Sequence, residues 1–179
     1  MGSPVSAFSF LIETLVHLYL VVVLLRILLE AVRADFYNPI VQVLLRLTDP
    51  LIKPLSKVIP NIGRLNVPGV VVLYVVQLIG LIVLVVLSGR AVDPLLLAVL
   101  AVMRLVRMLL VFYMIMIIVG VILSWIGQGV RHPLIPLVYQ LVDPVLAPIR
   151  RVLPDLGGID LSPLVAIIGI QFLIILLGL

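Results

Sequence analysis

Two side chains capable of proton transfer lie four residues apart in a long apolar segment near the N-terminus. Glu13 and His17 share one face of a helix at that spacing, and a carboxylate beside an imidazole in an apolar setting could relay a proton or a cation. The alternative is an interfacial pair, one or two turns from the surface. Both interpretations stay open, because two groups alone do not define a reaction.

A second charged pair and two glutamines complete the polar groups inside apolar segments. Arg26 and Glu30 have the i, i+4 spacing of a helical ion pair, which we predict at the headgroup level with Arg26 reaching the interface. Gln77 and Gln171 each interrupt a later apolar segment. They could line a polar path, or form interhelical hydrogen bonds worth roughly 0.6 kcal/mol each.

The remaining composition does not indicate enzymatic chemistry. The chain has no cysteine, which excludes disulfides and thiolate catalysis, and its histidines, His17 and His132, lie in different halves. We find no glycine-rich phosphate loop and no histidine-rich metal spacing. We therefore predict a protein that is not an enzyme and has no cofactor or metal. Nucleic-acid binding is not predicted, because the basic residues are few and lie among prolines and aliphatic residues.

The overall hydrophobicity places these residues in a membrane protein. The chain has 179 residues, of which 64% are hydrophobic and 11% charged, and its mean hydropathy is +1.43. Soluble domains are about half apolar and a quarter charged. We predict an all-α integral membrane protein with four transmembrane helices, since a span needs about 20 apolar residues. The predicted spans are residues 8–32, 67–87, 107–126 and 163–179.

Proline-rich segments at residues 38–60 and 132–154 separate the spans of each half. Asn38 before Pro39 predicts a helix start. Asp49 before Pro50, and Asp143 before Pro144 in the second segment, each predict a restart with the aspartate as N-cap. Each piece would be too short to cross, so we predict amphipathic or re-entrant helical hairpins. Further caps are expected near Asn66, Asp93 and Ser162. The candidate hairpin residues are Asp49, Pro50, Lys53, Pro54, Lys57 and Pro60, then Asp143, Pro144, Pro148, Arg150, Arg151 and Pro154.

The two halves match at a fixed offset of 94 residues, which predicts a tandem repeat. Residues 1–89 form the first repeat, residues 90–106 an interfacial linker helix, and residues 107–179 the second repeat. An even number of spans per repeat predicts parallel units. Only the first hairpin carries a continuous polar stripe, formed by Asn38, Gln42, Arg46, Asp49, Lys53 and Lys57.

The basic residues predict the orientation in the membrane. They concentrate in and around the two hairpins, so the positive-inside rule places both hairpins in the cytoplasm and both termini in the periplasm of a bacterial inner membrane. Arg90, Arg104 and Arg107, in the segment that joins the repeats, are the exception to this distribution.

The motifs of the second half resemble those of the YggT (YlmG) family of small membrane proteins. The resemblance rests on residues 123–126, 143–154 and 157–163, the last of which includes Asp160. The first copy departs from it at Glu30, Lys57 and Asn66. The resemblance implies an inner-membrane protein linked to osmotic-stress tolerance and ion homeostasis. Plastid members are linked to cytochrome complex assembly and to nucleoid or division organisation, and the family has no accepted enzymatic activity.

Two hypotheses follow for the function. In the first, the protein is a scaffold or assembly factor in the lipid bilayer, and Lys53, Lys57, Arg150 and Arg151 of its hairpins dock a membrane-protein partner at the cytoplasmic face. In the second, it is an ion channel or osmotic-release element lined by polar groups of the spans. Four spans make a thin pore, so the channel requires a homo-oligomer.

Overall fold

The computed structural model describes residues 4–89, 91–126, 132–154 and 160–179. Arg90, Arg131 and part of the family-like motif, residues 157–159, lie outside the described residues. The described part of the chain forms six helices. They are α1 (Pro4–Ala31), α2 (Pro39–Ser56), α3 (Val67–Leu87), α4 (Pro94–Ile126), α5 (Leu134–Arg150) and α6 (Ser162–Leu176).

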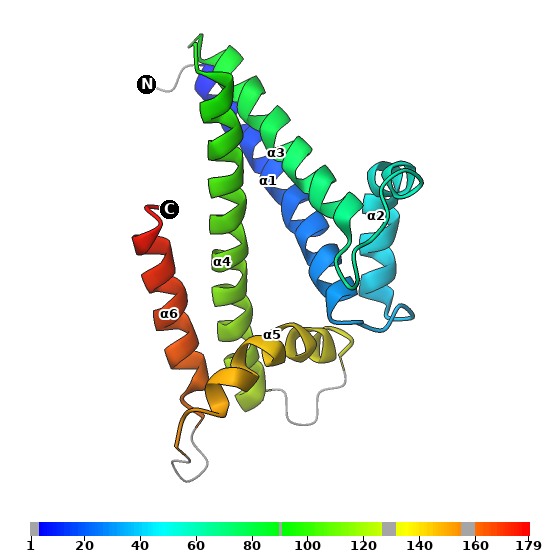
Figure 1. Ribbon diagram of the computed structural model, residues 1–179, viewed down its shortest axis with the longest axis vertical. Coiled ribbons are helices and arrows are strands. Elements are labelled where there is room, and N and C mark those ends of the chain that lie inside the picture. The colour runs from blue at the N-terminus through cyan, green and yellow to red at the C-terminus, as the bar shows by residue number, and fades with distance from the viewer. Residues whose placement is uncertain (1–3, 90, 127–131, 155–159) are drawn as a thin grey trace.

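The helices form two groups that share the long helix α4. α1 and α3 pack side by side, and α2 packs against both of them near the end of α1 (Figure 1). α6 packs against α4 on the side away from α3, and α5 crosses the end of α4 and contacts α1 and α6. α2 and α5 therefore lie toward the end of the molecule opposite the N-terminus.

Three helices are long and apolar enough to cross a membrane by length and composition, namely α1, α3 and α4. The bounds of α3 coincide with the predicted span at residues 67–87, and α1 covers most of the span predicted at residues 8–32. α6 is apolar but has only 15 residues. The predicted helical fold is thus confirmed for the described residues, and the three apolar helices are consistent with a multi-pass membrane protein. The fourth span and the tandem repeat stay predictions.

α4 is a single helix of 33 residues, so the expected separation into a linker helix and a span near Arg107 does not occur. Arginine is a good helix former, and no proline follows Pro94 within α4 to interrupt it. The charge of Arg104 is accommodated by an ion pair with α1, so a charged residue inside this apolar sequence does not end the helix.

The predicted restarts at Asp49 and Asp143 are also wrong, because α2 and α5 each continue through two internal prolines. An internal proline removes a hydrogen bond and crowds the preceding turn, at a cost of about 3 kcal/mol or more. In α2 the proline side chains lie on the exposed face, while Thr48 and Ile52, on either side of Pro50, are buried. Tertiary packing therefore holds the helix together where local preference favours a break.

Three of the predicted helix caps are confirmed. Asn38, Asn66 and Asp93 accept hydrogen bonds from backbone N–H groups in the first turns of α2, α3 and α4, at 2.9, 2.7 and 2.7 Å. For α6, Ser162 is not the cap; its backbone N–H donates instead to Asp160 at 2.9 Å. The Asp160 carboxylate, two residues earlier, thus satisfies one backbone N–H at the start of α6.

The core consists of apolar clusters at the helix contacts. One cluster joins α1 and α3 with Ile52 of α2 and Met108 of α4, and another joins α4, α5 and α6 around Ile117. A third connects α1 with α2 and α5. The N-terminal ends of α2 and α5 also meet directly, since Asn38 donates a side-chain hydrogen bond to the carbonyl of Pro133 at 2.8 Å.

Candidate functional site

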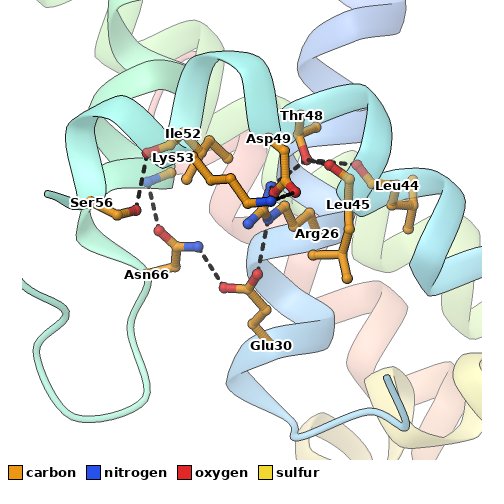
Figure 2. A network of polar contacts seen from close by, with 11 residues as sticks. Arg26, Glu30, Leu44, Leu45, Thr48, Asp49, Ile52, Lys53, Ser56 and Asn66 are labelled. Carbon is orange, nitrogen blue, oxygen red and sulfur yellow. Dashed lines mark hydrogen bonds and ion pairs between the residues drawn. The ribbon is translucent and has the colours of Figure 1, made fainter. Parts of the chain in front are cut away.

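A buried arginine lies at the junction of α1 and α2. Arg26 is only 8% exposed, and its Nε donates to Oε1 of Glu30, one turn later in α1, at 2.9 Å. Its Nη1 donates to Thr48 Oγ1 at 2.7 Å and to Asp49 Oδ1 at 2.8 Å, both in α2 (Figure 2). One guanidinium therefore joins two helices through its Nε and Nη1 groups, which a planar fork of donors makes possible.

The same network extends to α3 and to the surface. Glu30 accepts a hydrogen bond from the side-chain amide of Asn66, which in turn caps α3 (Figure 2). On the outer side, Lys53 pairs with Asp49 at 2.7 Å. Burial raises the pKa of the Asp49 carboxyl, but hydrogen bonds from Lys53 and Arg26 outweigh this effect and leave the pKa below its ordinary value. The network fixes α2 onto α1 and α3.

Two predictions about these residues were incomplete or wrong. The Arg26–Glu30 ion pair is confirmed, but Arg26 does not extend to the interface as expected; it points into the protein toward α2. Asp49 is not a helix cap and serves as an ion-pair partner in the middle of α2. Thr48 was not predicted as a site residue at all. The sequence gives no distinct signal for it, because Thr48 is one of two hydroxyl residues in α2.

A related cluster lies where α5 meets the start of α6. Arg150 of α5 pairs with Asp160 at 2.8 Å and with Asp143 at 3.2 Å, so Asp143 is an ion-pair partner and not the expected cap. Burial raises the pKa of Asp160, but hydrogen bonds from Ser162 and Arg150 outweigh it and lower the pKa overall. The three charged side chains are all partly exposed.

The two clusters correspond at the 94-residue offset, but their arginines come from different helices. Asp49 corresponds to Asp143, and Asn66 corresponds to Asp160. At the same offset, the residue that corresponds to Arg26 is Gly120 in α4. The residue that corresponds to Arg150 is Ser56 at the end of α2. In each cluster an arginine pairs with the corresponding carboxylate, but Arg26 comes from the long helix α1 and Arg150 from the short helix α5.

A cavity of about 630 Å³ lies between α1, α3 and α4. Its polar lining residues are Glu13, His17, Gln77, Arg104 and Arg107. Glu13, His17 and Gln77 are candidate residues from the sequence. The fold brings them together with Arg104 and Arg107, the two arginines that did not fit the predicted orientation. We call this space the α1–α3–α4 cavity.

The interactions inside this cavity differ from those expected. Glu13 forms its ion pair with Arg104, 91 residues away, at 3.1 Å, in place of the expected pairing with His17. Gln77 is 8% exposed and lines the cavity, whereas Gln171 lies on the exposed side of α6 and is absent from the lining. The two glutamines therefore do not share a path within one chain. Sequence reasoning missed the pairing of Glu13 because it spans two distant helices.

The remaining candidate residues lie on the surface. Lys53 is 72% exposed although paired, and Lys57 and Arg151 are exposed. The exposed prolines are Pro50, Pro54, Pro60, Pro144, Pro148 and Pro154. Within the described ranges, no three acidic, histidine or cysteine side chains are grouped so that they could hold a metal ion.

Comparisons with known proteins identify relatives along nearly the whole chain. The model of the CCB3/YggT family matches residues 5–87 and 99–179. The chain is 40% identical over 178 residues to an uncharacterized protein of Vibrio alginolyticus, covering 97% of this chain and 94% of that one. It is 38% identical to the uncharacterized protein YggT of Escherichia coli (strain K12), covering 91% and 85% respectively. No solved structure matches the chain.

Proposed function

The chain belongs to the CCB3/YggT family, and we propose that it acts as a non-enzymatic scaffold or assembly factor in the bacterial inner membrane, with a role in osmotic-stress tolerance and membrane homeostasis. The observation that carries this proposal is the presentation of α2. The helix is fixed from inside by the buried Arg26 network, and it carries an exposed basic stripe on its outside. A helix held in this way loses little conformational freedom when a partner docks.

The exposed side of α2 has two chemically distinct strips. Arg46, Lys53 and Lys57 form the basic strip. Next to it, Val43 and Leu47 are about half exposed, at 53% and 54%. A partner of matching chemistry is an amphipathic membrane-protein segment with acidic residues beside an apolar face.

The structure favours α2 over the paired hairpins as the docking surface. α2 and α5 meet at their N-terminal ends, and their C-terminal ends, which carry the basic residues, point in different directions (Figure 1). In addition, Arg150 is held by Asp143 and Asp160. α5 therefore offers only Arg151 as a basic residue without an ion pair in the described part of the chain.

The docking surface can be tested by crosslinked pull-down from native membranes. The variant Arg46→Glu/Lys53→Glu/Lys57→Glu is expected to lose the crosslinked partner while still inserting. A matched control is Arg33→Glu/Arg64→Glu/Arg151→Glu, which reverses three exposed basic residues outside α2. Equal loss in both variants would show a general charge effect and would reject α2 as the docking surface.

We also propose that α6 is a fourth span, so that two parallel units each place a short helix at the cytoplasmic face. In support, both halves have the order long helix, short helix with two internal prolines, apolar helix, and the family model matches each half. The chain has no cysteine, so single cysteines at Lys57, Ser88 and Arg151 can report sidedness with a membrane-impermeant maleimide. Labelling of Ser88→Cys from the cytoplasm would contradict this topology.

An oligomeric ion channel or osmotic-release element is the second candidate, and the α1–α3–α4 cavity favours it. Next to that cavity, however, buried Val23, Leu24, Ile27 and Val72 pack together, so a polar path does not continue past them in the described part of the chain. Ion flux in liposomes that is lost on Glu13→Gln or Gln77→Leu would support a channel. Absence of flux from well-folded protein would remove it.

A further inference from the structure

The α1–α3–α4 cavity has the size and the layout of a ligand site. Its volume of about 630 Å³ falls within the roughly 300–1,000 Å³ of small-molecule pockets. The charged lining residues Glu13, Arg104 and Arg107 are exposed, while the apolar lining residues Leu20 and Met108 are buried. The site thus combines a charged rim with an apolar interior.

One polar side chain in the cavity makes no hydrogen bond within the described part of the protein. Gln77 is 8% exposed near the middle of α3, and its side chain makes no hydrogen bond with any described residue. The amide is not among the fully buried side-chain atoms that lack a partner, so it is accessible from the cavity and free to bond to a molecule there. Because Gln77 lines the cavity, a molecule inside the cavity would supply the missing hydrogen bond.

The charges at the rim favour an anion. Glu13 is balanced by its ion pair with Arg104. Arg107 also lines the cavity, and it has no ion-pair partner among the described residues. The rim therefore carries one positive charge in excess.

The position of these arginines in the sequence gives an independent argument. In the proposed topology, Arg104 and Arg107 belong to the half of α4 away from the cytoplasm, where the positive-inside rule disfavours them. Charged residues inside membrane segments are costly and usually mark a functional site. Arg107 makes no structural ion pair among the described residues that would account for it.

We infer that the α1–α3–α4 cavity binds an anionic amphiphile. The anionic group lies at Arg107, beside the Glu13–Arg104 pair. A polar oxygen of the ligand bonds to Gln77. The hydrocarbon chain lies along the apolar lining, which includes Phe112 and Met116. Phosphatidylglycerol and a free fatty acid share this chemistry. The inference is separate from partner docking at α2, because the cavity contains no residue of α2.

The test uses the full chain, purified and delipidated in a neutral detergent, with bound lipid read by native mass spectrometry. The probes are dioleoyl phosphatidylglycerol, oleate and dioleoyl phosphatidylcholine. We expect one phosphatidylglycerol or one oleate to bind in preference to phosphatidylcholine. Retention of only one anionic probe identifies the source of the anion, and both outcomes support the site. Equal retention of all three probes, or of none, overturns it.

Two variants and one control locate the binding. Arg107→Gln is expected to weaken anion binding by about tenfold or more, the effect of removing a charge-assisted hydrogen bond. Gln77→Leu keeps the side-chain size and is expected to weaken both anionic probes without removing their preference over phosphatidylcholine. Arg46→Gln removes an exposed arginine on α2 and should leave binding unchanged. An equal loss in Arg46→Gln and Arg107→Gln would place binding on the surface and overturn the inference.

Discussion

Replacement of Arg26 by leucine should destabilise the protein more than any other single charge removal in α1 or α2. The substitution keeps an apolar side chain in the buried position and leaves Glu30 and Asp49 without their shared guanidinium. Breaking a buried ion pair typically costs about 3–5 kcal/mol. Here Asp49 keeps Lys53 and Glu30 keeps Asn66, so we expect the lower end of this range, about 3 kcal/mol.

The free energy of unfolding can be measured by adding sodium dodecyl sulfate to protein in maltoside micelles and following helicity by circular dichroism. Lys53→Met is the matched control, because it removes an ion pair to the same carboxylate from an exposed side chain. That change should cost about 1 kcal/mol or less. If Arg26→Leu costs no more than Lys53→Met, the network is not buried in the native state and the reasoning fails. A double-mutant cycle with Asp49→Asn measures the coupling directly.

Three further predictions concern packing, pH and capping. Gly80→Ala should lower the midpoint of thermal unfolding, because the added Cβ would lie 2.9 Å from a valine of α1. Gly120→Ala is the control and should not lower the midpoint, because its added Cβ has its nearest neighbour at 3.8 Å. Equal effects of the two substitutions would contradict the packing. The pKa of Asp160 is lowered in the folded protein. Its contribution to stability is therefore present above its ordinary pKa of 3.8 and is lost as the pH falls below that value. Asp160→Asn should consequently lose less stability between pH 6 and pH 3 than the wild type does. Asn38→Ala should lower the free energy of unfolding by about 1 kcal/mol through loss of the cap of α2, and further through loss of the hydrogen bond to the carbonyl before α5. The same detergent titration measures this change, and an unchanged free energy would show that the cap is dispensable.

Features set by a few neighbouring residues could be predicted from the sequence. The bounds of α3 and the caps at Asn38, Asn66 and Asp93 depend on local hydrophobicity and on one side chain that satisfies a nearby N–H group. Such interactions extend over only two or three residues, so composition and spacing determine them. The Arg26–Glu30 pair belongs to the same class, because it joins successive turns of one helix.

Features set by contacts between helices could not be predicted in this way. The spacing of Glu13 and His17 shows that they share a face, but not which helix that face meets, and the partner is Arg104. The prolines of α2 illustrate the same limit. Local preference predicts a break at Asp49, yet the contacts of Thr48 and Asp49 with Arg26 hold the two sides of the expected break in one helix.

The unequal lengths of the helices around α4 have a consequence for the surrounding lipid. At 1.5 Å per residue, α4 is about 50 Å long and α6 about 22 Å, against a hydrocarbon thickness of about 30 Å. In the proposed four-span topology, lipids beside α6 are therefore compressed, while α4 must tilt or draw the bilayer thicker around its apolar first turns. In that topology the protein imposes a thickness gradient across its own width, and its distribution should depend on the thickness of the bilayer.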